Sequence, residues 1–203
     1  MTDISLSTES LARRTMLVGV GGYKGSGKDE SLVTLISQYG FLVTGMSVPI
    51  DRSARMINPV ITWDKDEDRP VHYIEYVDVV CAGDFTLAKE HHEVRRFLQK
   101  LGGDFGRSID ENIWADQVGQ TIDETRSDGW NLAVSGIRFP NEIEMIRSRG
   151  GLLVWVSRPG FDDTSDKHIT ETSVSPEDFD VLVLNDGSKK QLHRRMLGTV
   201  LGS

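Results

Sequence analysis

The chain has 203 residues, a length that suits one domain. Hydrophobic residues make up 38% and charged residues 27%, which excludes disordered and fibrous chains. The 31 acidic residues outnumber the 23 basic ones, and the net charge of −8 argues against a nucleic-acid-binding protein, which needs many cationic contacts to phosphate.

Residues 1–15 are polar and lack apolar periodicity, so we expect a flexible leader there. The apolar run at 16–20 is far shorter than the about 20 residues of a membrane-spanning helix, so no membrane partner is expected. The single cysteine, Cys81, cannot form an internal disulfide. These features together favour a cytoplasmic protein.

Residues 16–20 predict a strand buried on both faces of a parallel sheet, and a helix with Leu32, Leu35 and Ile36 on one face follows. A second strand is expected at 41–46. Residues 49–85 lose clear periodicity and contain three prolines. They predict a solvated loop or an excursion above the sheet.

Helical periodicity returns in residues 86–101, where Gly102 and Gly103 are expected to end the helix, and again in 110–128. The first of these helices is expected to turn one shared apolar face inward. That face consists of Leu87, Val94, Phe97, Leu98 and Leu101.

Three more apolar strands are predicted at 132–134, 152–156 and 181–184. A helix with Asn141 as N-cap and Glu144 in a capping box follows the first of them, and a closing helix is expected at 189–201. The polar stretch 158–178 is too long for an ordinary connection and is a candidate lid. Five buried strands alternating with helices predict an α/β three-layer fold with a parallel sheet.

The most specific motif is G-x-x-x-x-G-K directly after the first strand, and it predicts a nucleotide phosphate site. Glycines let backbone N–H groups converge on phosphate oxygens, the helix start adds positive potential, and the motif lysine reaches the outer phosphates. An ordinary glycine-rich turn is the alternative. The motif residues are Gly22, Tyr23, Lys24, Gly25, Ser26, Gly27 and Lys28.

The residues after Lys28 depart from this motif, which has a serine or threonine there to help hold Mg²⁺. The chain has Asp29, Glu30 and Ser31 instead. Either nucleotide oxygens and water hold the metal, or one of these three residues contributes, and the sequence leaves the metal ligands open.

Several ordered motifs resemble the deoxynucleoside monophosphate kinases of bacteriophages, a family with the nucleoside monophosphate kinase fold that is distantly similar to phosphomevalonate kinase. The resemblance spans residues 16–200. The segments that carry it are Gly22 to Asp29, Phe97 to Gly102 with Arg107 and Ile113 to Asp116, Val134 to Glu142, Arg158 to Gly160, Asp166-x-His168-x-x-Glu171, and Phe179-Asp180 leading to Asn185-Asp186-Gly187.

The resemblance implies a P-loop kinase domain over 16–203 that uses ATP and Mg²⁺ to convert a deoxynucleoside monophosphate into its diphosphate. It also implies an acceptor-binding region at 49–130, a lid at 158–178 that carries His168 and Glu171, and a location in the host cytoplasm if the chain is phage-encoded. Asn185 and Gly187 would flank the adenine. The family has an acid near the end of the third strand, where this chain has Ser135 and Gly136.

Arginines are the expected phosphate ligands, because an acceptor that is already anionic needs positioning and cations rather than a general base. Arg138 follows the third strand, at the edge of the sheet where ligands bind, and with Lys28 and Arg158 it is a candidate catalytic residue. Each cation could instead be a surface charge. The acceptor-binding candidates are Arg52, Arg55, Gln99, Arg107, Trp114 and Arg138, although Trp114 at helical spacing could equally be core.

Two alternatives remain open from the sequence. The chain could be a nucleotide-binding regulatory protein that has lost catalysis, or a P-loop kinase for another small phosphorylated acceptor. In each case the expected partners are small-molecule nucleotides, with neither nucleic acid nor membrane, and the chain is a monomer or a homodimer.

Overall fold

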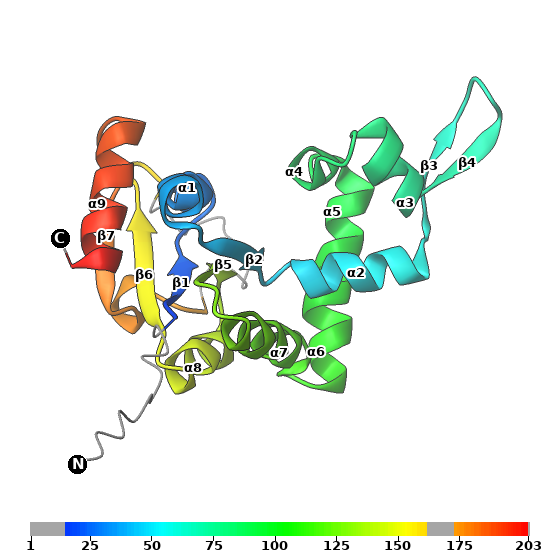
Figure 1. Ribbon diagram of the computed structural model, residues 1–203. Coiled ribbons are helices and arrows are strands. Elements are labelled where there is room, and N and C mark those ends of the chain that lie inside the picture. The colour runs from blue at the N-terminus through cyan, green and yellow to red at the C-terminus, as the bar shows by residue number, and fades with distance from the viewer. Residues whose placement is uncertain (1–14, 162–172, 203) are drawn as a thin grey trace, which may run out of the picture.

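Five parallel strands form the sheet at the centre of the molecule. The computed structural model describes residues 15–161 and 173–202. Neighbouring strands are parallel throughout this sheet, and Val18 lies between Ala133 and Leu152. The predicted α/β fold with a five-stranded parallel sheet is confirmed. The strands, in the spatial order β2-β5-β1-β6-β7, are β1 (Leu17–Gly21), β2 (Leu42–Gly45), β5 (Leu132–Ile137), β6 (Leu152–Ser157) and β7 (Val181–Leu184) (Figure 1).

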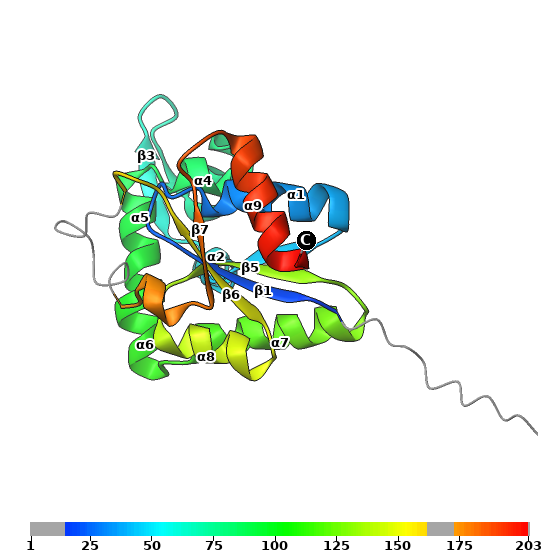
Figure 2. The ribbon, with the colours of Figure 1, turned by 90° about the vertical axis from the view of Figure 1, so that its left-hand side faces the viewer.

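Helices cover both faces of this sheet (Figure 2). On one face α1 (Lys28–Tyr39) and α9 (Lys189–Leu201) pack on the β1 side chains through buried leucine and methionine residues. On the other face lie α7 (Ile113–Ser127) and α8 (Pro140–Ser148). Ile36, expected to face inward, is exposed, because Leu32 and Leu35 form the buried stripe of α1 and Ile36 falls at its edge.

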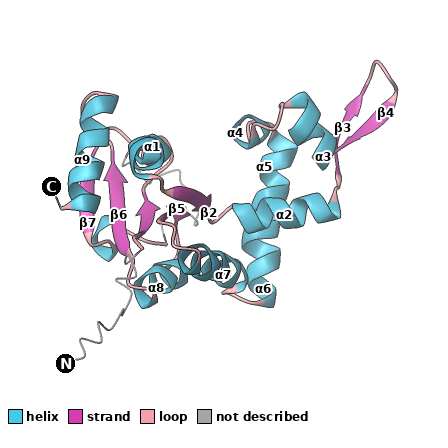
Figure 3. Ribbon diagram, viewed as in Figure 1, coloured by secondary structure: helices cyan, strands magenta, loops and turns pink. Residues whose placement is uncertain are grey.

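Residues 48–109, called the insert below, separate β2 from α7. The insert is mostly helical, with one hairpin that projects from it (Figure 3). The excursion expected at 49–85 exists, but it is ordered rather than a loop, because Ile61, Tyr73 and Val77 give it buried contacts. Its elements are α2 (Val48–Ile57), β3 (Val60–Asp64), β4 (Arg69–His72), α3 (Tyr73–Glu75), η1 (Tyr76–Val80), α4 (Phe85–Ala88), α5 (His92–Gln99), η2 (Lys100–Phe105) and α6 (Gly106–Ile109).

The predicted helix at 86–101 is two helices. The first, α4, ends at Ala88, and Leu87 is exposed rather than inward-facing. Helical turns then continue past Gly102 to Ile109, so the predicted stop is also wrong. Gly102 serves packing instead, because a Cβ there would lie 2.6 Å from Cδ1 of Ile50 on α2.

Helix α8 has a different cap from the one predicted. Phe139 is the N-cap, Pro140 is the first helical residue, and the Glu142 carboxylate accepts the backbone N–H groups of Arg138 and Phe139. Proline suits this position because its φ is already helical and it has no N–H to satisfy. The helix therefore starts two residues earlier than an Asn141 cap would give, and Glu142 replaces Glu144 as the capping-box acid.

The candidate lid at 158–178 is described only at its two ends, 158–161 and 173–178, where η4 (Pro176–Asp178) lies. His168 and Glu171 fall outside the described residues, as does the leader up to residue 14. Within the described ranges, no helix combines the length and the apolar character needed to cross a membrane.

Candidate active site

The loop between β1 and α1 has the backbone shape that phosphate binding requires. Gly22, Gly25 and Gly27 have φ angles of 144°, 80° and 89°, which residues with side chains rarely adopt. A Cβ at Gly22 would lie 2.5 Å from the carbonyl oxygen of Val156. The loop leads into the N-terminus of α1, where N–H groups without helical partners attract anions.

Side chains from distant segments hold this loop in place. Nδ2 of Asn185, after β7, donates a hydrogen bond of 2.9 Å to the carbonyl oxygen of Ser26. The Arg158 guanidinium donates to the carbonyl oxygen of Gly25 at 3.4 Å and lies over the ring of Phe161. Three segments selected from the sequence therefore meet at one place: the glycine loop, the start of the candidate lid and the loop after β7.

The three residues after Lys28 have different partners. The Ser31 hydroxyl is buried and donates to the carbonyl oxygen of Lys28 at 2.6 Å, so it turns back on its own helix. Glu30 pairs with Lys189 and His193 of α9, and the hydrogen bond from Lys189 lowers its pKa. Of the three, Asp29 is the one whose side chain contacts the sheet, near the carboxyl end of β5.

Asp29 meets Ser135, which lies near the end of β5. The Ser135 hydroxyl donates to Oδ1 of Asp29 at 2.5 Å. The pair brings one carboxylate and one hydroxyl together beside the glycine loop, and both supply the hard oxygen ligands that Mg²⁺ prefers.

Arg138 begins the turn from β5 to α8, and Glu142 fixes its backbone. One Glu142 oxygen accepts the N–H of Arg138 at 2.7 Å, and the other accepts from the Arg107 guanidinium at 2.7 Å. The pKa of Glu142 is raised, because the effect of burial exceeds the opposing effects of these N–H donors and the Arg107 charge. The Arg138 guanidinium itself has no hydrogen bond or ion pair to another described residue.

Arg107 is therefore placed differently from its predicted role in acceptor binding. Its side chain is 17% exposed and stacks on the Phe139 ring, with its guanidinium carbon 3.6 Å from the centroid. It also donates to the carbonyl oxygen of Glu111 at 3.0 Å. These contacts hold the Arg107 side chain against the turn that carries Arg138.

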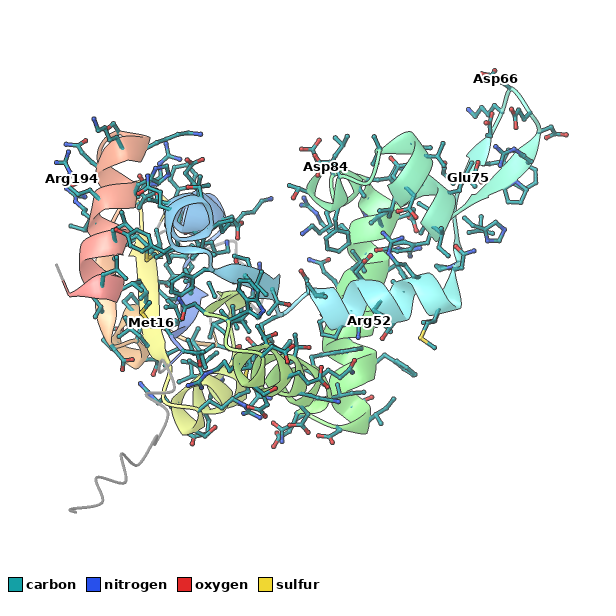
Figure 4. The ribbon with its side chains drawn as sticks, in the orientation of Figure 1. Met16, Arg52, Asp66, Glu75, Asp84 and Arg194 are labelled. Carbon is teal, nitrogen blue, oxygen red and sulfur yellow. The ribbon has the colours of Figure 1, made fainter. Side chains whose placement is uncertain are left out.

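The remaining acceptor candidates divide into core and surface. Trp114 is 3% exposed and its indole N–H donates to the carbonyl oxygen of Gly102, so it occupies the core position that its helical spacing also allowed. Arg55 pairs with Asp51 and Asp78, which neutralise the charge that a phosphate would use. Arg52 on α2, labelled in Figure 4, and Gln99 on α5 have exposed side chains.

Lys89 is a cation that the sequence analysis did not select. It follows α4 in the insert, is half-buried, and its Nζ lies 4.3 Å from the centroid of the Phe85 ring. The pKa of Lys89 is lowered, mainly by burial and then by the charge of Arg138. The charges of Asp29 and Asp51 oppose this shift without reversing it. No motif signals this residue, because it comes close to Arg138 and Asp29 only through the tertiary fold.

The chain matches the family model for deoxynucleotide monophosphate kinase over residues 52–196. The deoxynucleotide monophosphate kinase of Enterobacteria phage T4 is 26% identical over 146 residues, which cover 71% of this chain and 59% of the phage protein. That of Escherichia phage RB69 is 32% identical over 105 residues, which cover 51% and 43%. A putative deoxynucleotide monophosphate kinase of Acanthamoeba polyphaga mimivirus is 23% identical over 198 residues, which cover 91% and 96%.

Solved structures give weaker matches. Dephospho-CoA kinase from Campylobacter jejuni has a TM-score of 0.48 and 10% identity, over 93% of this chain and 97% of that one. A sugar kinase from a Janibacter species has a TM-score of 0.46 and 14% identity, over 93% and 95%. Both scores are below 0.5, and the fold assignment rests on the strand order given above.

Proposed function

The chain belongs to the deoxynucleotide monophosphate kinase family, and from this premise we propose that it transfers the γ-phosphoryl group of ATP to a deoxynucleoside monophosphate, giving ADP and the diphosphate. The observation that carries the proposal is a pocket lined by both the glycine loop and Arg138, with Asp29 hydrogen-bonded to Ser135 near the end of β5 and with α4 of the insert facing α1 (Figure 1). An open α/β sheet binds its ligands at this edge.

Phosphoryl transfer to a monophosphate needs cationic groups and correct positioning, and this arrangement supplies both. The acceptor phosphate is already an anion at neutral pH, so catalysis consists of positioning and of charge stabilisation on the transferring group. We assign that stabilisation to Lys28, Arg138 and Arg158. Lys28 begins α1, Arg138 follows β5, and Arg158 contacts the glycine loop.

The donor nucleotide would bind along the glycine loop. Residues 22–28 would surround its phosphates, and the loop that contains Asn185 and Gly187 would flank its adenine. The hydrogen bond from Asn185 to Ser26 supports this assignment, because it joins the two parts of the proposed donor site. We assign no contact to the Glu30 carboxylate, which was also expected in the ATP site, because it pairs with Lys189 and His193 of α9.

Asp29 and Ser135 fit a Mg²⁺ ion through their oxygen atoms. We propose that the Asp29 carboxylate supplies the protein ligand and that Ser135 orients it. When bound, the ion would neutralise charge on the nucleotide phosphates.

The acceptor would lie between the sheet edge and the insert. Arg52 and Gln99 stay proposed contacts on the insert, and Arg138 is the proposed contact from the sheet. The other three acceptor candidates would stabilise the walls of this site without touching the ligand. Two of them are engaged in ion pairs and one is buried: Arg55, Arg107 and Trp114.

A coupled assay of ADP release tests the function. With ATP and Mg²⁺, we expect turnover with at least one of dAMP, dCMP, dGMP, dTMP and dUMP, far above the ATP hydrolysis seen without acceptor. Lys28→Met should remove this turnover while the far-UV circular dichroism spectrum stays unchanged. Background rates with every acceptor would contradict the proposal, and turnover only with another phosphorylated compound would favour a different small-molecule kinase.

A further inference from the structure

Lys89 is fixed in the insert by contacts on both sides of it. The Asp84 side chain caps α4 by accepting the N–H groups of Thr86 and Leu87. The Lys89 N–H donates to the carbonyl oxygen of Phe85, and its own carbonyl oxygen accepts from Arg95. Figure 4 labels Asp84 on the side of the insert that faces α1. These hydrogen bonds fix the backbone of Lys89 directly after α4.

The ammonium group of Lys89 has no anionic partner in the described chain. Within the described residues, its side chain contacts the face of the Phe85 ring. A half-buried ammonium loses hydration, and a neutral ring replaces only part of that interaction. Asp29 and Asp51 act on Lys89 through their charge, but no ion pair joins either of them to it.

Arg138 is a second cation without an ion pair to another described residue. Its charge contributes to the lowered pKa of Lys89, so the two side chains are within electrostatic range of each other although they are 49 positions apart in sequence. Two cations placed near each other repel unless an anion lies between them. An anionic phosphate between the two side chains would remove this repulsion.

We infer that Lys89 is an acceptor-binding residue: together with Arg138 it holds the phosphate of the deoxynucleoside monophosphate between the insert and the sheet. This inference rests on the proposed function. The acceptor is favoured over the donor because Lys89 comes from the insert, whereas the donor phosphates have the glycine loop and Lys28. Its contact with the Phe85 ring restricts the position of the ammonium group.

Steady-state kinetics of Lys89→Met test the inference. Methionine keeps an unbranched side chain against Phe85 and removes only the charge. With the best acceptor of the wild-type assay, we expect the KM for the monophosphate to rise about 10-fold or more, the loss typical of one hydrogen bond to a charged group. The KM for ATP should stay within about twofold. Lys89→Arg should recover part of the loss, and Lys65→Met, at the exposed hairpin tip, is the matched control.

Calorimetry without ATP separates a phosphate contact from a structural role. We expect Lys89→Met to weaken binding of the monophosphate and to leave binding of the matching nucleoside, which lacks the phosphate, unchanged. An equal loss for both ligands, an unchanged KM for the monophosphate, or a parallel rise in the KM for ATP would overturn the inference.

The same measurements separate this inference from the proposed function. Monophosphate binding that depends on Lys89, without any turnover by the wild type, would overturn the kinase function and support the phosphate site. Turnover that is indifferent to Lys89 would overturn the site alone. A wild-type protein that binds no monophosphate would overturn both.

Discussion

Asp29 and Ser135 have exchanged the chemical groups expected at their positions. A phosphate-binding loop has a hydroxyl after its lysine, and the family resemblance implies an acid at the end of the third strand. Here the carboxylate follows Lys28 and the hydroxyl lies on the strand, yet the two still form a hydrogen bond of 2.5 Å. The same pair of groups is present with the two backbone positions interchanged, and this is the reason for proposing Asp29 as the ligand of a hard cation.

Asp29→Asn should therefore weaken metal binding in the nucleotide complex. We expect the affinity for Mn²⁺, measured by electron paramagnetic resonance in the presence of ADP, to fall about 10-fold or more, because the amide lacks the negative charge that attracts the ion. Ser135→Ala should have a smaller effect, since it removes an orienting hydrogen bond. Glu30→Gln is the control, because Glu30 pairs with α9. Unchanged Mn²⁺ affinity in Asp29→Asn would contradict the assignment.

At the residue scale, the sequence predicts best where a local motif sets the backbone. The glycine loop and the position of Arg138 after a strand follow from neighbouring residues alone. The sequence could not assign Arg107 or Lys89, because the partners that define them, Glu142 in one case and Arg138 in the other, are distant in the chain. For Trp114, the helical spacing already favoured the core position that it occupies.

At the scale of elements, the Arg107–Glu142 ion pair joins the insert to the sheet. Arg107 lies on α6, whereas Glu142 caps α8 and binds the backbone N–H of Arg138. The Glu142 side chain is only 3% exposed, so a change of one partner leaves the other charge buried. A buried pair of this kind is costly to break from one side.

Arg107→Met should thus lower the free energy of unfolding by about 3 kcal/mol or more, measured by urea denaturation at pH 7. The Arg107→Met/Glu142→Gln double variant should lose less than the sum of the two single variants, because neither unpaired charge then remains. Arg147→Met, whose ion pair with Asp180 is exposed, is the matched control and should change stability by less than about 1 kcal/mol. Additive losses would show that the two side chains do not act as a pair.

The elements of the sheet could be predicted because buried parallel strands are short apolar runs between turn signals. The elements of the insert were harder to predict, because its helices are short and its apolar periodicity is interrupted. Gly102 is the clearest case: glycine usually ends a helix, but here a helical glycine makes space for Ile50. A tertiary contact of this kind overrides a local signal.

On the scale of the whole molecule, the insert and the sheet share one hydrophobic core. Val94 and Leu98 of the insert belong to the same cluster of buried side chains as Leu132 and Trp155 of the sheet. A second cluster lies between α1, α9 and the opposite face. The insert is therefore attached to the rest of the molecule on its side near α7 and α8. Its opposite side, which contains α4, faces α1 (Figure 1). A ligand bound between α4 and the sheet would join the insert to the sheet at a second place.

Hydrogen exchange measured by mass spectrometry should reveal that connection. A monophosphate alone should slow exchange in residues 84–99, because it would tie α4 and α5 to the sheet through Lys89 and Arg138, and opening of a segment becomes rarer when a ligand binds only its closed form. ATP alone should protect residues 22–32 and leave 84–99 unchanged. The matching nucleoside at the same concentration is the control for the phosphate. If the monophosphate protected only residues 22–32, it would occupy the donor loop, and the separate acceptor site between insert and sheet would be wrong.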